Sequence, residues 1–556
     1  MAPPGCPAVA PVGKWKVIGH LQLLCLLALA QPGGPAWPCP ALCQCFGNMT
    51  VFCSEEGLRN IPEEIPPSTT QLFFVETALA SVPSRAFTNI AGSSHLTTLA
   101  FLGSSLEALG EAAFAGLPAL RVLEISTSQL TALPGEALHG LTNLSTLSVK
   151  FSPIETLETG LFNSTPRLET LHLQGNEMES LPSDIFHPLR SLKTLTLSQN
   201  HLAELPGEVL APLGSLQVLK LSDNNLTCLP PGFFLPLVQL QELFLDGNAL
   251  MELPPGAFSR LTSLKGLHLQ HNALRGLLPS VFAAQTNLTS LYLDNNRLTE
   301  LPERLFHGTP SLSVLSVANN QLQALPARLF RKSPCLTLIV LSHNRLSRLP
   351  AGVFQGLPAL TKLLLSHNNL TALPRDAFAN LTSLEVLDLA HNQLATLPEG
   401  IFDSNIILFN VALKSNPWAC DCHLAHMADW LQHTDALLNL QTLCRSPAYL
   451  KGLSLPTVKK EQLVCLPGPG SSRCRAEGLE PSGEPGTLPQ CTYQDPVGAI
   501  HLACDPDACQ QLSLHLPGQH FSENWTLGSG CGTVRVHITV HIEQDKAQPG
   551  GEAVLP

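Results

Sequence analysis

The chain has 556 residues, a formal net charge of -12 and 44% hydrophobic residues, so it is long enough for several domains and can bury a core. Only 13% of its residues are charged, which excludes a disordered polyelectrolyte, and 31 Lys and Arg against 43 Asp and Glu provide no basic stripe for nucleic acid. The 47 prolines and 39 glycines follow no three-residue period, which excludes collagen.

The N-terminus is typical of an export signal. Lys14 and Lys16 precede an apolar run at 17–30, which is shorter than the ~20 residues that a membrane span needs. The run ends in Ala28, Leu29 and Ala30, a small-x-small pattern that suits signal peptidase. We therefore expect a signal peptide at 1–30 and a secreted protein without a membrane span. A membrane anchor is the alternative.

Acceptor motifs for N-linked glycans, Asn-x-Ser/Thr, occur along the whole chain. The acceptor residues are Asn48, Asn143, Asn163, Asn225, Asn287, Asn369, Asn380 and Asn524. So many motifs behind an export signal predict that several of them carry glycans.

A 24-residue repeat dominates the chain. Residues 216–226 carry leucine at frame positions 1, 4, 6 and 11 and asparagine at position 9, and the same frame returns at 240–250. Starts from Leu72 to Leu408 in steps of 24 give fifteen units. The asparagine column comprises Asn176, Asn200, Asn224, Asn248, Asn272, Asn296, Asn320, Asn344, Asn368, Asn392 and Asn416. This is the leucine-rich repeat signature, and it predicts a repeat domain at 72–415.

The repeat pattern predicts how the residues of each unit pack. Each unit should add one short strand to a curved parallel sheet, with the frame leucines pointing inward. The buried asparagines can bridge backbone groups, because an amide both donates and accepts. The convex side should be packed by Phe234, Phe258, Phe282, Phe306, Phe330, Phe354, Phe378 and Phe402. Prolines there oppose long helices, so we expect an α/β leucine-rich repeat solenoid with a largely irregular convex side.

Cysteines flank the repeats, where the end leucines of a stack need covering. The N-terminal group is Cys39, Cys43, Cys45 and Cys53, and the C-terminal group is Cys420, Cys422, Cys444 and Cys465. We expect disulfide caps at 39–71 and 416–466, although spacing alone leaves the pairings open. Because Cys420, Cys422 and His423 are also zinc-ligand types, a zinc site is the alternative for the second cap.

Two cysteines lie within the repeats, four units apart and thus too distant to pair with each other. Cys228 lies between the inward Leu226 and Leu229, which predicts a packed thiol. Cys335 occupies a column otherwise held by residues such as Ser263, which predicts an exposed position. It is either a free thiol or bonded to another segment.

The tail after the second cap does not repeat. Residues 467–490 are rich in Pro, Gly and Ser and predict a linker. Alternating apolar residues predict a small β module at 491–542, followed by a disordered end at 543–556. Two disulfides are expected among Cys491, Cys504, Cys509 and Cys531, which leaves Cys474 over.

The outward strand positions, the third, fifth and seventh of the frame, suggest a binding face. Aromatic residues share the fifth position on three adjacent units amid carboxylates, and an apolar patch follows farther along. Such surroundings are typical of a protein-binding patch, whereas isolated exposed apolar groups are the alternative. The candidate partner-binding residues are Glu242, Phe244, Asp246, His268, Tyr292, Asp294, Leu338, Val340 and Leu364.

Catalytic and cofactor signals are weak. The chain has no His-Glu-x-x-His pair, no Gly-x-Ser-x-Gly elbow and no phosphate loop, so we expect neither an enzyme nor a cofactor. His343, His367 and His391 recur at the eighth position and could sense pH or bind a metal. Solvated histidines are the favoured interpretation.

Several segments resemble one family. They include the run Pro38-Cys39-Pro40, the run Asn416-Pro417-Trp418 and the run Cys420-Asp421-Cys422-His423. In the tail, Cys491-Thr492-Tyr493 and Leu502-Ala503-Cys504-Asp505 add to the match. From about Cys39 to about Ile542 the chain resembles the regulatory, non-catalytic leucine-rich repeat subunits of carboxypeptidase N.

The resemblance implies a plasma glycoprotein without activity of its own. It would bind and stabilise the catalytic subunit of carboxypeptidase N, a zinc enzyme that removes C-terminal Arg or Lys from circulating peptides, in a heterotetramer of two catalytic and two regulatory subunits. It also implies the pairs Cys39–Cys45, Cys43–Cys53, Cys420–Cys444 and Cys422–Cys465. The alternatives are a carrier subunit of a growth-factor complex and a soluble receptor for a matrix or microbial ligand.

Overall fold

The computed structural model describes residues 38–47, 49–433 and 441–465, together with the backbone of five strands between 492 and 539. The chain forms two units. The repeat unit comprises the described residues up to 369 with 376–388 and 402–408, and the C-terminal unit comprises 370–375, 389–401 and the chain from 409. The predicted signal peptide, linker and disordered end lie outside the described residues.

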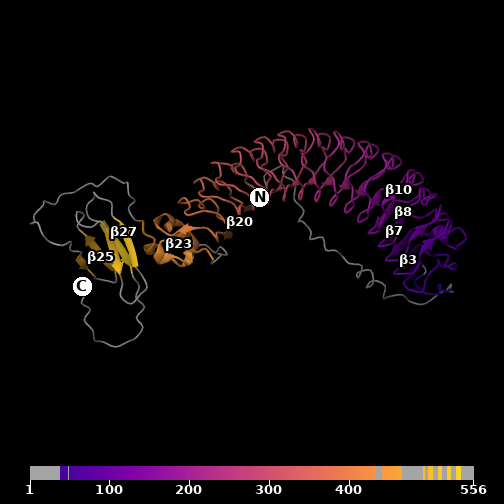
Figure 1. The fold of residues 1–556 in the computed structure, drawn as a ribbon, viewed down its shortest axis with the longest axis horizontal. Coiled ribbons are helices and arrows are strands. Elements are labelled where there is room, and N and C mark those ends of the chain that lie inside the picture. The colour runs from indigo at the N-terminus through magenta and orange to yellow at the C-terminus, as the bar shows by residue number, and fades with distance from the viewer. Residues whose placement is uncertain are drawn as a thin grey trace, which may run out of the picture. The chain divides into compact units, whose positions relative to one another are not determined.

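Successive coils of the repeat unit stack side by side and curve, as Figure 1 shows from indigo to orange. The strands β1 and β2 form an antiparallel hairpin, and from β2 onward each strand pairs in parallel with that of the next repeat. The bounds are β1 Cys43–Phe46, β2 Thr50–Cys53, β3 Gln71–Val75, β5 Thr98–Leu102, β7 Val122–Ser126, β9 Thr146–Lys150, β11 Thr170–His172, β12 Thr194–Thr196, β13 Val218–Lys220, β14 Glu242–Phe244, β15 Gly266–His268, β16 Ser290–Tyr292, β17 Val314–Ser316, β18 Leu338–Val340, β19 Lys362–Leu364 and β20 Val386–Asp388.

The asparagine column forms the predicted ladder beneath the sheet. Asn248 Nδ2 donates to the carbonyls of Leu221 (2.9 Å) and Leu245 (3.1 Å), and its Oδ1 accepts from the Leu226 amide at 3.1 Å. Asn272 repeats these bonds one unit later. The side chains are buried, so each amide satisfies backbone groups that have no water available. The bridging role predicted for this column is confirmed.

Replacing one asparagine of the buried column tests how much its hydrogen bonds stabilise the fold. Asn272→Ala should lower the free energy of unfolding by about 2–4 kcal/mol, because it leaves a buried amide and two buried carbonyls without their partner. Denaturant unfolding measures the loss. Gln323→Ala, an exposed change two repeats farther along the chain, serves as the control. An equal effect of both variants would contradict the structural role.

The eighth frame position has left-handed backbone geometry. The φ angles there are 54° at Asp223, 56° at His271, 57° at His343 and 55° at His367. Non-glycine residues with positive φ are enriched in Asn, Asp and His. The left-handed backbone at this position therefore favours histidine, among other residues.

The convex side consists mainly of turns, as the prolines predict. Its short elements are β4 Ser81–Val82 paired with β6 Ala108–Leu109, β8 Ala132–Leu133 paired with β10 Thr156–Leu157, and the 3-10 turn η2 Ser93–His95. The phenylalanine column is buried, and its rings stack between neighbouring repeats at 6.1 Å for Phe258–Phe282 and 6.0 Å for Phe306–Phe330. One layer of rings thus fills the space under the turns.

The first repeat departs from the 24-residue step. Leu72 lies in register with Leu99, which in turn pairs with Leu123. Leu72 therefore occupies the fourth frame position, not the first, and the prediction of a start at Leu72 is wrong. The first step is longer because the chain between Phe87 and Leu96 contains the additional turn η2.

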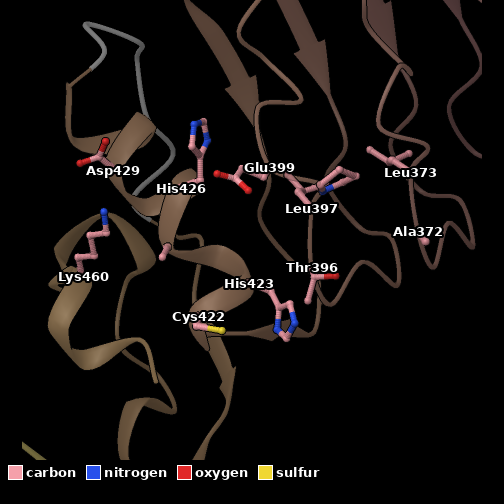
Figure 2. Close-up of a pocket in the computed structure, with 12 residues that line it drawn as sticks. Ala372, Leu373, Thr396, Leu397, Glu399, Cys422, His423, His426, Asp429 and Lys460 are labelled. Atoms are coloured by element: carbon pink, nitrogen blue, oxygen red, sulfur yellow. The ribbon is translucent and has the colours of Figure 1, made fainter. Parts of the chain in front are cut away.

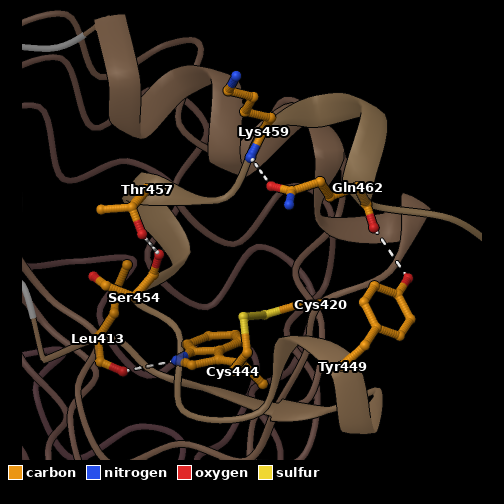
Figure 3. Close-up of a disulfide and its surroundings, with 9 residues drawn as sticks. Leu413, Cys420, Cys444, Tyr449, Ser454, Thr457, Lys459 and Gln462 are labelled. Atoms are coloured by element: carbon orange, nitrogen blue, oxygen red, sulfur yellow. Dashed lines mark hydrogen bonds between the residues drawn. A yellow bond between two sulfur atoms is a disulfide. The ribbon is translucent and has the colours of Figure 1, made fainter. Parts of the chain in front are cut away.

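The C-terminal unit contains the second cap. Its elements are β21 Asn410–Ala412, β22 Trp418–Ala419, η3 Cys422–Leu424, α1 Ala425–His433, β23 Cys444–Ser446, η4 Ala448–Leu450, η5 Leu455–Thr457 and η6 Lys460–Gln462. Buried Trp418 donates from Nε1 to the Leu413 carbonyl at 3.0 Å and is paired in strand register with Cys444. Figure 3 shows the disulfide that joins Cys444 to Cys420. The Tyr449 hydroxyl donates to the Gln462 carbonyl at 3.0 Å. Trp418 and the disulfide therefore form the centre of this cap.

The predicted small β module is present beyond the cap. Strands β24 Thr492–Gln494, β25 Ala499–Cys504 and β28 Val534–Thr539 pair antiparallel, and β26 Gln511–His515 pairs with β27 Ser522–Thr526. The expected disulfides of this module and the leftover Cys474 concern side chains outside the described residues.

Four disulfides close the two caps. They join Cys39 to Cys45, Cys43 to Cys53, Cys420 to Cys444 and Cys422 to Cys465, which are the pairs that the resemblance implies.

Both predictions for the cysteines within the repeats need correction. Cys228 is an exposed free thiol, because the two residues between inward Leu226 and Leu229 both point outward. Cys335 is only 6% exposed, so its predicted exposure is wrong. It is disulfide-bonded, so of the two options the free thiol is wrong and the disulfide is confirmed.

Candidate functional site

Three rings stack across the strands β14, β15 and β16 on the outward face of the sheet. The ring centroids of Phe244 and His268 are 4.1 Å apart with planes 11° from parallel, and those of His268 and Tyr292 are 4.8 Å apart at 19°. Strand register places these residues directly opposite one another. The shared frame position thus builds a continuous, half-buried aromatic ladder.

Carboxylates surround this ring stack. Asp246 accepts a hydrogen bond from the Ser222 hydroxyl at 2.6 Å. Asp294 accepts from the Ser316 hydroxyl and from the Ala318 amide, the latter at 2.7 Å. The structure thus brings the predicted acidic and aromatic residues together on adjacent strands.

Sequence reasoning missed a cation at one end of the stack. Lys220 Nζ lies 4.9 Å from the centroid of the Phe244 ring, an arrangement that favours a cation–π interaction. The signal was available, since Lys220 holds the same fifth frame position one repeat earlier.

Burial controls the protonation of the stack. It lowers the pKa of His268 to about 4, with a smaller contribution from Lys220 in the same direction and an opposing one from Asp246. The imidazole is therefore neutral at physiological pH. Burial also raises the pKa of the Tyr292 phenol and of the Glu242 carboxyl.

The pKa of His268 predicts a pH-dependent stability. Between pH 6.5 and about 4 the unfolded chain binds a proton that folded His268 does not, so stability falls as the pH falls through this window. The loss between pH 7.5 and 5 should be about 2 kcal/mol. Denaturant unfolding at both pH values, compared with the ring-preserving variant His268→Phe, isolates this contribution. Equal pH dependence of the two proteins would contradict the assignment.

The predicted apolar patch lies farther along the same face. Val340 on β18 is in register with Leu364 on β19, and both are half-buried. Leu338 is instead in register with Lys362, whose side chain is exposed. Two of the three apolar residues are therefore direct cross-strand neighbours, and the third borders a charge.

The glycan acceptor motifs occupy other faces of the repeats. Asn225 and Asn369 follow the buried asparagine of their repeats, and Asn287 directly precedes a first leucine. Asn163 and Asn380 are exposed in the convex turns, whereas Asn143 is half-buried and donates to the Pro118 carbonyl at 2.9 Å. Asn48 and the Asn524 side chain lie outside the description. Among the described acceptor sites, none lies in a strand of the repeat sheet.

The zinc alternative for the second cap is wrong. Among the described residues, the ligand-type group that converges is Cys422, His423 and Cys465. Cys422 and Cys465 are joined in a disulfide, and Cys420 is bonded to Cys444, so none of these sulfurs is a thiolate. A disulfide sulfur does not provide the thiolate ligand that zinc requires.

A cavity of about 520 Å³ lies within the C-terminal unit. In the view of Figure 2, Asp429 and Lys460 lie at the left, Leu373 and Ala372 lie at the right, and the other labelled lining residues lie between them. His426 Nδ1 accepts from the Gly400 amide at 3.4 Å, and the Cys422 sulfur is in a disulfide. The lining therefore combines charges of both signs with no activated nucleophile among the drawn residues.

Sequence comparison defines the class of this protein. A family model described as leucine rich repeat matches overlapping segments from 94–154 to 358–416, which together span more than half of the chain. The chain therefore belongs to the leucine-rich repeat family. In the described part of the chain, no helix is long and apolar enough to span a bilayer.

Within this family, the chain is similar to carboxypeptidase N subunit 2. It is 43% identical to the Mus musculus protein over 172 residues, which is 27% of this chain and 31% of that protein. Identity to the Homo sapiens protein is 45% over 166 residues, 26% of this chain and 30% of that protein. The matched segments thus span less than a third of these relatives.

A more distant curated relative is the insulin-like growth factor-binding protein complex acid labile subunit of Rattus norvegicus. It is 37% identical over 94 residues, which is 16% of this chain and 15% of that protein.

Solved structures share the fold. A leucine-rich repeat protein of Leptospira interrogans superposes with a TM-score of 0.56 at 29% identity, over 65% of this chain and 89% of that one. The glycosylated Toll–Spätzle complex of Drosophila matches with a TM-score of 0.64 at 22% identity, over 82% of this chain and 63% of that one. The second match concerns the fold alone.

Proposed function

We propose that this chain is a secreted, glycosylated and non-catalytic scaffold that binds and stabilises the catalytic subunit of carboxypeptidase N in plasma. That enzyme is a zinc carboxypeptidase acting on C-terminal Arg or Lys of circulating peptides, and the assembly holds two catalytic and two regulatory subunits. The similarity to carboxypeptidase N subunit 2, at 43% and 45% identity, carries the proposal.

The outward face of the repeat sheet is the proposed contact surface. The side chains from Phe244 to Tyr292 are half-buried and stacked on one another, so binding would order few additional rotamers. Tyrosine and other aromatic side chains dominate the binding energy of protein interfaces. The described glycan acceptors lie outside these strands, which leaves the face open to a protein.

Stabilisation follows from binding alone. A scaffold that binds the folded enzyme and not its unfolded chain raises the enzyme's stability by mass action. This stabilisation of the enzyme requires no catalytic group in the present chain.

Co-expression tests the proposal. This chain is secreted together with the carboxypeptidase N catalytic subunit, and the medium is separated by size exclusion with an assay for Arg and Lys release. The expected result is activity at a larger size than the enzyme alone, with slower thermal inactivation. Separate peaks with unchanged inactivation would overturn the proposal.

A second candidate is a carrier subunit of a growth-factor complex, which the rat acid labile subunit similarity favours. Pull-down from plasma separates the two, because each function predicts a different co-purified protein. A soluble receptor for a matrix or microbial ligand would co-purify neither.

A further inference from the structure

The carboxylate of Glu242 is folded sideways over the neighbouring strand. In register, Glu242 on β14 lies opposite Gly266 on β15, and Gly266 lies opposite Ser290 on β16. A Cβ atom added to Gly266 would overlap Glu242 Oε2. The absence of a side chain at Gly266 thus makes room for this carboxylate on the face of the sheet.

A row that includes two small residues lies beside the aromatic stack. The third-position row holds Gly266 and Ser290 between the larger Glu242 and Val314. His268 and Tyr292, two strand positions away on the same two strands, form the adjoining wall. The Glu242 carboxylate therefore lies over the smallest residue of this row, beside the aromatic side chains.

The Glu242 carboxylate lacks a hydrogen-bond donor within the described chain. His268 Nε2 lies 3.9 Å from Glu242 Oε2, which is longer than a hydrogen bond. The imidazole is neutral at physiological pH, because burial lowers the pKa of His268 to about 4. Glu242 is 38% exposed on its side chain, so it remains open to an incoming group.

The two lysines near Glu242 have other contacts. Burial raises the pKa of the Glu242 carboxyl, which shows that its charge is incompletely solvated, although Lys265 and Lys220 oppose this shift. Lys220 lies over the Phe244 ring, and the Lys265 ammonium donates to Gln241 Oε1 at 3.0 Å. Neither amine forms an ion pair with Glu242 in the described structure. Asp246 and Asp294 add two further carboxylates nearby.

We propose that the Glu242 carboxylate, which lies over Gly266 beside the aromatic stack, receives a basic side chain, arginine or lysine, of the protein partner. The inference rests on the proposed binding function of this face. Arginine and lysine carry an aliphatic stem that packs against aromatic walls and a cationic head that pairs with a carboxylate. The Glu242 carboxylate and the ring stack offer both surfaces on adjacent strands. Glu242 and Gly266 thus become specificity-determining residues of the interface.

Two variants test the inference in the full-length protein. Glu242→Gln keeps the shape of the side chain and removes its charge, and Gly266→Ala places a methyl group where the carboxylate now lies. The affinity for the carboxypeptidase N catalytic subunit is measured by surface plasmon resonance at low and at physiological salt. Glu300→Gln, an exposed carboxylate outside the strands, is the matched control.

Glu242→Gln should weaken binding about tenfold or more and reduce the salt dependence, because a partly desolvated charge pair is lost. Gly266→Ala should weaken it several-fold, and Glu300→Gln should stay within twofold of wild type. Circular dichroism establishes that each variant is folded.

The outcomes separate the inference from the proposed function. A Glu242→Gln affinity within twofold of wild type, with unchanged salt dependence, overturns the basic-side-chain inference. The binding function of the face then still stands if removal of the rings weakens binding. If wild-type protein does not bind the enzyme, both proposals are overturned.

Discussion

The double variant Phe244→Ala/Tyr292→Ala is expected to weaken binding of the carboxypeptidase N catalytic subunit at least a hundredfold. Truncation of a central aromatic residue in an interface commonly costs about 2 kcal/mol or more, and a hundredfold loss corresponds to about 2.8 kcal/mol. Removing the two outer rings also leaves His268 without the stacking partners on either side. The affinity and the co-elution of enzymatic activity are the measurements.

A matched aromatic control separates this effect from general loss of surface area. Phe151 is 52% exposed and lies at the end of β9, outside the ring stack. Phe151→Ala should leave the affinity within twofold. If Phe244→Ala/Tyr292→Ala binds as wild type does, the partner does not use this part of the face.

Removal of the Cys420–Cys444 disulfide is expected to destabilise the second cap by about 2–5 kcal/mol. The bridge joins residues 24 apart in sequence, and both cysteines are buried beside Trp418. Cys420→Ala/Cys444→Ala increases the conformational entropy of the unfolded chain, because the cross-link is lost. It also leaves a cavity in the folded cap, because the buried sulfur atoms are removed. Hydrogen exchange of residues 413–465 should rise before that of the central repeats, because each repeat contacts only its neighbours.

Cys228→Ser is the control for the disulfide variant. This thiol is exposed and free, so its replacement should change the free energy of unfolding by less than about 0.5 kcal/mol. Unchanged exchange in the cap of the disulfide variant would contradict the stabilising role of the bridge.

The period of the sequence was sufficient to predict the repeat architecture. Leucines such as Leu243 and Leu245 recur at fixed spacing and are fully buried, and the asparagine column forms the predicted hydrogen bonds. Equivalent positions of successive repeats have the same packing environment, so a prediction for one repeat also holds for its neighbours.

Predictions failed where the chain departs from the periodic frame. Leu72 pairs with Leu99 because the first repeat contains an additional turn, which the leucine spacing of later repeats does not reveal. Cys228 points outward although it lies between inward leucines, since the backbone there does not alternate residue by residue.

For the proposed binding face, the sequence predicted which residues are neighbours on adjacent strands but not how their side chains are oriented. Phe244, His268 and Tyr292 share one frame position, and parallel register therefore places them side by side. Their near-parallel planes, the position of Lys220 over the first ring and the lowered pKa of His268 depend on side-chain conformation and burial.

The sequence alone determined the repeat period, the inward leucines, the asparagine ladder and the row of aromatic residues, because these features follow from local spacing that is repeated many times. The tertiary structure decided the register of the first repeat, the orientation of Cys228 and the placement of Glu242 over Gly266. These depend on contacts between residues of different repeats. Steric fit and desolvation set such contacts, and both arise only when neighbouring strands are about 4.8 Å apart.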